Sequence, residues 1–352
     1  MSDRSRINRS PLIIAGMHRS GTSLTASILK RSGIDIGSDL FSADQHNQRG
    51  YFEDVDFLEF QREILQRSCG DREPGWPDWG WAAAETLDKS QWNQEISEAE
   101  TLIEPRQKKR HWGWKDPRTT LMLDFWRSRL PDAKFILVYR FPWDVADSIF
   151  RIGHPYFIEQ ADMGIRAWFF YNWHLLDFYR RHSNQAVLFN INALQRKPDF
   201  LVDALVHKLG YDGTSIVRPD SQDIIEPGLM GQLPLESPLV QGIRAITPRY
   251  MALLSQLDQH SDLPSTLDHS ASPTVEVKDL QTPPLNFPER HLLALYAQKL
   301  QQERQYAQDA HNLGERLNYL ESALRVYERS IVTRGYVKLK RRFLDRWDRF
   351  KK

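Results

Sequence analysis

The fold is decided by the stretch "IIAGMHRSGTSL", which runs from Ile13 to Leu24. An apolar, strand-like run leads into Gly16, four residues follow, and Gly21 then opens a segment with helical character. A strand that ends in a glycine-bounded loop and continues as a helix presents backbone N–H groups to an anion, and the helix dipole adds to their attraction. The stretch therefore predicts a phosphate-binding loop.

The interior of this loop is rich in hydrogen-bond donors but lacks the lysine that usually follows the second glycine of a P-loop. Thr22 stands in its place. The later strand-like run "KFILVY" ends in Arg140, where a nucleoside triphosphatase would carry an aspartate for Mg²⁺. The positive charge is thus expected from Arg19 and Arg140, and we expect no metal. The candidate phosphate-binding residues of the loop are Arg19, Ser20, Gly21, Thr22 and Ser23.

Strand-like and helix-like segments alternate over about the first 210 residues, which indicates an α/β fold with a parallel sheet flanked by helices. Three apolar runs are the expected strands: "PLIIAG" (11–16), "AKFILVYR" (133–140) and "AVLFNINAL" (186–194). A helix-like segment follows each of them. The continuous apolar character of the second run is typical of a strand that is covered on both faces.

Composition excludes several classes of protein. The chain has 352 residues, of which 41% are hydrophobic, so it can build a sizeable core. Its formal net charge of +1 argues against a general nucleic-acid binder. One cysteine, Cys69, excludes an internal disulfide framework and a cysteine-rich zinc site. We see no secretory signal, and the longest apolar runs are too short to cross a bilayer, so we expect a soluble, cytoplasmic protein.

The last part of the chain differs from the rest. Residues 261–290 are rich in Pro, Ser and Thr, which predicts a linker between a domain at 10–260 and a helical segment at 291–352. Within that segment a heptad seam predicts a coiled coil, and with it a homo-oligomer formed through residues 310–331. The seam residues, at alternating spacings of three and four, are Ala310, Leu313, Leu317, Leu320, Leu324, Tyr327 and Ile331.

The end of the chain, "RGYVKLKRRFLDRWDRFKK" (334–352), is basic and contains Phe343, Trp347 and Phe350. Two interpretations stay open from the sequence. The segment either lies on an anionic membrane surface, which would make the protein membrane-associated, or forms a solvated helical tail.

The residues described above resemble those of sulfotransferases that use 3′-phosphoadenosine 5′-phosphosulfate (PAPS). "IIAGMHRSGTSL" is similar to the 5′-phosphosulfate loop of that family, in which a Lys or Arg just before Ser-Gly-Thr corresponds here to Arg19. A second element of the family holds the 3′-phosphate with a strand that ends in Arg and a Ser eight residues later. "YRFPWDVADSIF" supplies Arg140 and Ser148 at that spacing.

Two further segments, "GYFED" (50–54) and "WGWKDPRTT" (112–120), are similar to segments of bacterial members, and the resemblance spans roughly residues 10–235. It implies a sulfotransferase fold of the P-loop type and transfer of the sulfuryl group of PAPS to a hydroxyl, with PAP as product. The expected acceptor is a carbohydrate or a glycolipid. The chain lacks the amino-terminal anchor typical of Golgi sulfotransferases, which favours a bacterial cytosolic enzyme.

The resemblance also implies catalytic roles. Arg19 or Lys115 would donate to the leaving-group oxygen as negative charge develops on it. Some members carry a histidine directly after the lysine, but Asp116 stands there in this chain. Other members use a glutamate as the general base, and Glu53 in "RGYFEDVDF" is the best candidate for that role. Its rivals are three other acids, Asp54, Asp56 and Asp116.

Two neighbours of these residues receive no catalytic role. His18 occupies a loop position that resembles a proline in other members. Arg118 is expected either to pair with Asp116 or to contact an anionic acceptor.

Two other functions fit parts of the sequence. A nucleotide-dependent kinase could use a degenerate P-loop. In a non-catalytic scaffold near a membrane, the coiled coil and the basic tail would be the working parts. An enzyme of the sulfotransferase type accounts for both phosphate-binding elements and is the preferred interpretation.

Overall fold

The computed structural model describes residues 10–42, 50–69, 81–82, 87–219, 231–246, 248–270, 272, 277 and 287–350. The chain divides into two compact units, Met1–Ala297 and Gln298–Lys352. About half of the linker expected at 261–290 lies outside the described residues, and the domain boundaries expected from the sequence stay predictions.

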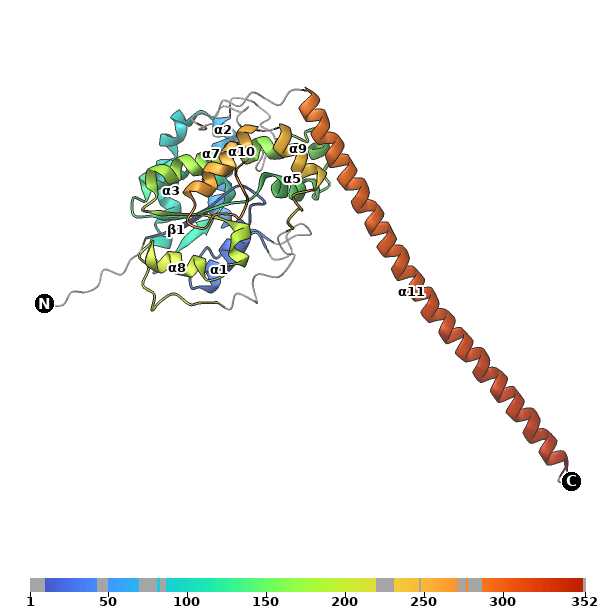
Figure 1. The fold of residues 1–352 in the computed structure, drawn as a ribbon. Helices are drawn as coiled ribbons and strands as arrows, with labels where there is room; N and C mark the ends of the chain where they lie inside the picture. Colours follow the sequence, from blue (N-terminus) through green and yellow to red (C-terminus); the bar gives the residue numbers. More distant parts are fainter. Residues whose placement is uncertain are drawn as a thin grey trace. The chain divides into compact units, whose positions relative to one another are not determined.

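The first unit is built on a four-stranded parallel sheet with the strand order β2-β1-β3-β4 (Figure 1). In the register of the sheet, Ile14 lies opposite Lys115 on one side and Ile136 on the other. The strands are almost entirely buried, which explains why they read as continuous apolar runs. The strands are β1 (Leu12–Ala15), β2 (Gly113–Lys115), β3 (Lys134–Tyr139) and β4 (Ala186–Asn190).

The α/β fold with its parallel sheet is confirmed. The three expected strands are present, although the third ends at Asn190, and β2 is an addition. With only three residues, "GWK", β2 offers no run of β-branched side chains for a sequence pattern to detect. Its pairing depends on a glycine. A Cβ atom at Gly113 would lie 1.8 Å from the carbonyl oxygen of Leu12, so any side chain there would separate β2 from β1.

Helices cover both faces of the sheet (Figure 1). On one face, α1 and α8 share a hydrophobic core with Ile14, Ile136 and Val187 of the strands. On the other face lies α7, whose Phe178 ring meets Phe135 of β3 at a centroid distance of 4.7 Å. The helices of this unit are α1 (Thr22–Arg31), α2 (Val55–Ser68), α3 (Ile96–Ile103), α4 (Leu123–Arg129), α5 (Pro142–Phe150), α6 (Pro155–Glu159), α7 (Met163–His182), α8 (Phe200–His207), α9 (Pro238–Ile246) and α10 (Pro248–His260).

The strand order creates a switch point between β1 and β3. From β1 the chain passes to β2 on one side, whereas from β3 it passes to β4 on the other side. In open α/β sheets, ligands bind outside the carboxyl ends of the strands at such a point. Residues 16–21 follow β1 there, and Arg140 follows β3. The fold therefore brings the two phosphate-binding elements expected from the sequence to one edge of the sheet.

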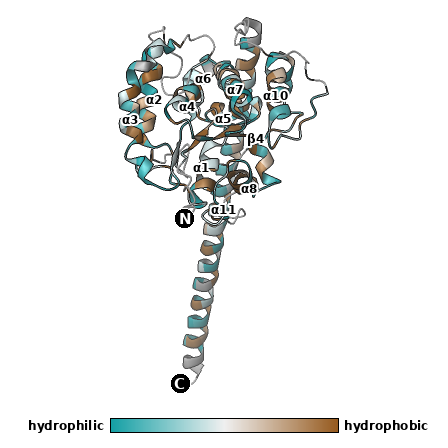
Figure 2. Ribbon diagram, turned by 90° about the vertical axis from the view of Figure 1, so that its left-hand side faces the viewer, coloured by the Kyte–Doolittle hydropathy of each residue, from teal (hydrophilic) through white to brown (hydrophobic). Residues whose placement is uncertain are grey.

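The second unit contains most of α11 (Phe287–Phe350), a continuous helix of 64 residues. Its first turns are part of the first unit, where Leu293 and Ala297 are buried. Beyond them, apolar and polar residues alternate along the helix (Figure 2). Seam residues such as Leu317 and Leu324 are more than half exposed. The expected helical extension is confirmed, and its pairing as a coiled coil stays a prediction. No helix in the described part of the chain combines the length and the apolar character needed to cross a membrane.

Candidate active site

The loop between β1 and α1 is held close to the neighbouring strand. The Gly16 N–H donates to Thr120 Oγ1 at 2.9 Å, and a Cβ atom on Gly16 would lie 2.3 Å from the carbonyl oxygen of Val138. Gly21 has a φ of 90° and precedes α1, so its left-handed backbone starts the helix at Thr22. The unpaired N–H groups of the first helical turn therefore face the loop, where they can bind an anion.

Arg19 is held in a left-handed conformation, with a φ of 65°, which is strained for any residue other than glycine. Its Nε donates to Ser148 Oγ on α5 at 2.9 Å, and its carbonyl accepts from Arg140 Nη1 at 3.1 Å. Next to it, the Oγ of Ser20 is buried and has no hydrogen-bond partner among the described residues. A guanidinium and a buried, unsatisfied hydroxyl thus lie together where an anion would satisfy both.

Alanine variants are usually more stable than glycine variants at the same position, but the strain at Arg19 predicts the opposite order there. Arg19→Gly is expected to be about 1 kcal/mol more stable than Arg19→Ala, because only glycine adopts this backbone conformation without cost. Thermal unfolding of the two variants measures the difference. Arg31 in the last turn of α1 is the matched control, since at a helical position alanine is expected to be the more stable by about 1 kcal/mol. Equal stability of the two Arg19 variants would contradict the strain.

Arg140 is buried at the end of β3 and remains charged at neutral pH. Burial lowers its pKa to about 10, the nearby Asp144 opposes that shift, and the positive charges of Arg151 and Arg19 lower the pKa further. Its guanidinium donates to the carbonyl oxygen of Gly231 and lies 3.9 Å from Asp144 Oδ2. Two neighbouring guanidinium groups repel each other, and a bound anion would remove that repulsion.

Asp144 is a residue of this site that the sequence patterns did not single out. Its Oδ1 accepts from the N–H of Leu233 at 2.9 Å, and its Oδ2 accepts from Asn192 Nδ2 at 3.1 Å. Burial raises the pKa of this carboxyl, and the positive charge of Arg140 opposes the increase. The one sequence signal is its position four residues after Arg140, in the first turn of α5.

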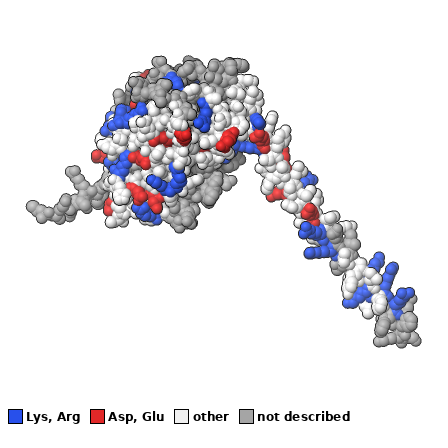
Figure 3. All heavy atoms as spheres, viewed as in Figure 1, with Lys and Arg blue, Asp and Glu red and all other residues white. Residues whose placement is uncertain are grey.

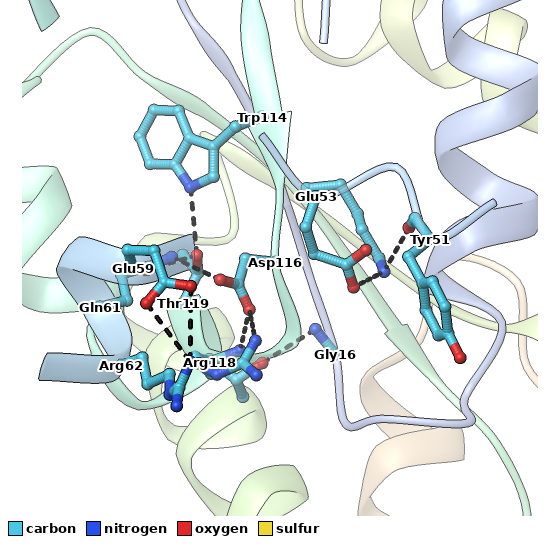
Figure 4. Close-up of polar contacts among 12 residues, drawn as sticks. Gly16, Tyr51, Glu53, Glu59, Gln61, Arg62, Trp114, Asp116, Arg118 and Thr119 are labelled. Carbon is cyan, nitrogen blue, oxygen red and sulfur yellow. Dashed lines mark hydrogen bonds and ion pairs between the residues drawn. The ribbon is translucent and has the colours of Figure 1, made fainter. Parts of the chain in front are cut away.

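A second cluster lies at the end of β2, around the buried amine of Lys115. Figure 4 labels two of its members, Tyr51 and Glu53. The Nζ atom donates to the carbonyl oxygen of Tyr51 at 2.9 Å and to Ser23 Oγ on α1 at 3.3 Å, and it pairs with Glu53 Oε1. Phe52, between the two acceptors, has a φ of 64°. This left-handed residue turns the Tyr51 carbonyl and the Glu53 carboxylate toward the same amine. The fold therefore joins Lys115, Glu53 and the phosphate loop.

Glu53 is the acid of this cluster that retains an available acceptor atom. Its Oε2 is buried and has no hydrogen-bond partner among the described residues. Burial raises the pKa of Glu53, the positive charge of Lys115 opposes that increase, and the negative charge of Asp116 adds to it. A carboxylate with a raised proton affinity and a free oxygen has the properties of a general base.

Two of the three rival acids are occupied by a structural ion pair. Arg106 Nη2 donates to both oxygens of Asp54, at 2.7 and 2.9 Å, and to Asp56 Oδ2 at 2.8 Å. The guanidinium also stacks over the ring of Phe57, 4.9 Å from its centroid. Both carboxylates are therefore engaged by Arg106 at the start of α2.

The third rival, Asp116, is fully engaged in a buried network (Figure 4). Its Oδ1 accepts from the backbone N–H of Arg118 at 2.8 Å and from Arg118 Nη1 at 3.1 Å. Its Oδ2 accepts from Gln61 Nε2 at 3.0 Å, and Gln61 Oε1 accepts from Thr119 Oγ1 at 2.6 Å. Arg118 thus pairs with Asp116, one of the two arrangements expected. No sequence signal marks Gln61, which lies in the middle of α2.

His18 lies among the cations of the site. Its pKa is lowered well below the ordinary value, first by burial and then by the positive charges of Arg118, Lys115 and Arg19, so the imidazole is neutral at pH 7. Its ring meets Tyr171 of α7 edge-on at a centroid distance of 6.0 Å. The sequence places Arg19 next to His18, but only the fold brings Lys115 and Arg118 to it, because these two lie in a distant segment of the chain.

Comparison with known proteins identifies the family. The family model described as "Sulfotransferase family" matches residues 11–211. The sulfotransferase domain of the olefin synthase from Synechococcus PCC 7002 is a similar solved structure: 19% identity, 70% of this chain and 91% of that chain covered, TM-score 0.36. The sulfotransferase STF9 from Mycobacterium avium is another, with 16% identity, 59% and 65% covered and a TM-score of 0.32. No curated protein matches the chain. Since the family model spans more than half of its length, this chain is an enzyme of the sulfotransferase family.

Proposed function

We propose that this enzyme transfers the sulfuryl group of PAPS to a hydroxyl group of a carbohydrate or a glycolipid. The observation that carries the proposal is the connection of two cationic clusters through one phosphate loop. Arg19 of that loop contacts Ser148 beside Arg140, and Ser23 at the start of α1 contacts Lys115. PAPS carries anionic groups at two separated positions, and two cationic clusters on one sheet edge fit that distribution.

The residues of the site fit the co-substrate. Arg140 and Ser148 would hold the 3′-phosphate. Ser20, with its buried and unsatisfied hydroxyl, would donate to the 5′-phosphosulfate together with the first turn of α1. Arg19, which belongs to the phosphate loop, contacts both Ser148 and Arg140. The remaining residues proposed to bind the phosphosulfate are Gly21, Thr22 and Ser23.

Sulfuryl transfer makes two demands on the protein, since PAPS supplies a sulfuryl group on a phosphate leaving group. The charge that develops on the leaving oxygen needs a fixed cation, and Lys115, buried and in contact with the loop, meets that need, with Arg19 as the second donor. The acceptor hydroxyl must lose its proton. Glu53 would accept that proton on Oε2 while Lys115 holds its other oxygen.

An aromatic pair next to Glu53 supports a sugar as the acceptor. The rings of Phe41 and Tyr51 meet edge-on at a centroid distance of 5.4 Å, and the Phe41 N–H donates to the carbonyl oxygen of Glu53 at 2.8 Å. Phe41 is 45% exposed. The apolar face of a sugar ring packs well against such an exposed aromatic ring, which would place its hydroxyl groups near Glu53.

The proposal is tested by transfer of labelled sulfate from PAPS to a panel of glycans, glycolipids and small alcohols. We expect labelled product from at least one acceptor with a sugar hydroxyl. Transfer only to amines or to simple alcohols would contradict the proposed acceptor class. Thermal shift separates the kinase alternative, because a sulfotransferase should be stabilised by PAP without a metal, whereas a kinase should be stabilised by ATP–Mg²⁺ alone.

Arg140→Ala is expected to weaken the binding of PAP by about 10–100-fold, because a hydrogen bond to a charged group contributes about 1.5–3 kcal/mol. Isothermal calorimetry measures the change. Arg166→Ala is the control: Arg166 is a partly buried arginine of α7 that pairs with Asp162, so its loss should leave PAP affinity unchanged. An Arg140→Ala variant with the affinity of the wild type would remove Arg140 from the proposed binding site.

A further inference from the structure

The distal part of α11 carries an apolar stripe that is separate from the heptad seam. The stripe begins at Val332 and continues through Tyr336, Leu339 and Phe343, at spacings of four, three and four. We call these four residues the distal stripe. Successive residues of an α-helix are about 100° apart. A series that starts one residue after the last seam position, 331, therefore lies on another face of the helix, and a partner that covers the seam leaves the distal stripe uncovered.

The distal stripe is exposed along its whole length. Its side chains are between 66% and 71% exposed. Val337 and Leu344, about a third of a turn away from the stripe, are 56% and 53% exposed. Contiguous apolar surface on a soluble helix is unfavourable in water and marks an interaction surface.

The side of α11 opposite the distal stripe is basic. Helical spacing places Arg334, Lys338 and Arg341 about half a turn from the stripe, while Lys340 and Arg346 flank it. Figure 3 shows Lys and Arg side chains gathered along this end of the helix. Between residues 332 and 346 the sequence has six Lys and Arg residues and a single acid, Asp345.

We propose that residues 332–346 bind an anionic lipid surface, with the helix lying in the plane of the interface. The distal stripe would enter the boundary of the acyl chains, and the cations would reach the headgroups. The long side chains of Lys340 and Arg346 can extend from the stripe edges toward the headgroups while their methylenes stay in the apolar layer.

An anionic lipid surface provides both an apolar layer for the distal stripe and negative charge for the basic residues. A second copy of the chain packed on the distal stripe would bring the flanking Lys340 and Arg346 of the two copies together, which repel each other, and would leave the basic face on the opposite side without a partner. A nucleic acid would neutralise the basic face but leave the apolar side chains in water. The charge of the segment and the sign of an anionic leaflet are complementary, whereas a neutral leaflet offers only the apolar contribution.

Co-sedimentation of the full chain with vesicles tests the proposal. We expect the chain to bind vesicles of phosphatidylcholine mixed with phosphatidylglycerol at least about tenfold more strongly than vesicles of phosphatidylcholine alone, since each basic residue near an anionic surface adds about fivefold. Raising the salt concentration to about 1 M should release the protein, because surface charges are then screened. Equal binding to both kinds of vesicle would overturn the proposal.

Two double variants assign the binding to the distal stripe. Leu339→Glu with Phe343→Glu is expected to lower vesicle binding at least about tenfold by removing apolar contacts and adding repulsive charge. The matched control is Tyr319→Glu with Val326→Glu, which makes the same charge change at exposed residues of α11 outside the seam and the stripe. The control should bind as the wild type does, and circular dichroism checks that helicity is retained.

Equal loss of binding in the two double variants, or full binding by the stripe variant, would show that the stripe is not the binding surface. Light scattering measures self-association and so tests a second copy of the chain as the partner. If the stripe variant loses self-association and keeps vesicle binding, the stripe joins copies of the chain and the proposal is wrong. None of these measurements involves PAPS, so the result does not depend on the proposed function.

Discussion

Glu53→Gln is expected to lower kcat by about 10²–10⁴-fold while the affinity for PAP stays close to that of the wild type. Glutamine keeps the size of the side chain and can still accept a hydrogen bond from Lys115, but it cannot take a proton from the acceptor hydroxyl. Labelled-sulfate transfer gives kcat, and calorimetry gives the affinity for PAP. Loss of turnover without loss of nucleotide binding would assign Glu53 to the proton transfer.

The pH profile adds a signature that a structural role would not produce. Burial raises the pKa of Glu53 above its ordinary value of 4.5, and the base works only when it is deprotonated. The rate constant kcat/KM should therefore fall as the pH decreases through the raised pKa, with the acid limb above pH 4.5. The residual activity of Glu53→Gln should lack this limb.

Asp54→Asn is the matched control for Glu53→Gln, because it makes the same acid-to-amide change one residue along the chain. Both oxygens of Asp54 accept from Arg106, so we expect lower stability with a kcat within about threefold of the wild type. If Glu53→Gln turns over normally while Asp116→Asn does not, the base is Asp116.

Lys115→Met is the second substitution with a large expected effect, a decrease of about 10²–10³-fold in kcat. Methionine fills a similar volume in the core but carries no charge to stabilise the leaving oxygen. The variant should also change the pH profile. Since the positive charge of Lys115 lowers the pKa of Glu53, its removal should move the acid limb of kcat/KM to higher pH.

Lys208→Met provides the control for the loss of a paired lysine. Lys208 pairs with Asp262 and donates to Tyr179 Oη at 3.0 Å, away from the phosphate loop, so its loss should leave kcat unchanged. A Lys115→Met variant with nearly normal kcat and an unmoved acid limb would exclude Lys115 from catalysis. Arg19 would then be the remaining donor to the leaving group.

Local patterns in the sequence predict the parts of the fold that local physics determines. The continuous apolar runs predict β1 and β3, because strands buried on both faces need no alternation. The run at 186–194 predicts one strand, but the strand ends at Asn190, where the side chain accepts from the N–H of Asn192 at 3.0 Å and starts a 3-10 turn. Such side-chain competition for the backbone shifts element ends by a few residues.

The candidate site also contains residues that local sequence predicts and residues that only the fold reveals. The phosphate loop could be read from the sequence, because spacing along the chain determines it. The contacts of Gln61 with Asp116 join residues far apart in sequence, and no spacing rule reaches across that distance. The sequence leaves Asp54 as a rival of Glu53, and its pairing with Arg106 likewise depends on the fold.

The two left-handed residues, Arg19 and Phe52, limit how this site can change by mutation. Each such residue costs about 1–3 kcal/mol, and a domain typically has only about 5–15 kcal/mol of net stability. The active site therefore already uses part of the margin that tolerates new substitutions. Changes in the acceptor pocket that adapt the enzyme to another hydroxyl compound would accumulate only alongside stabilising changes elsewhere in the core.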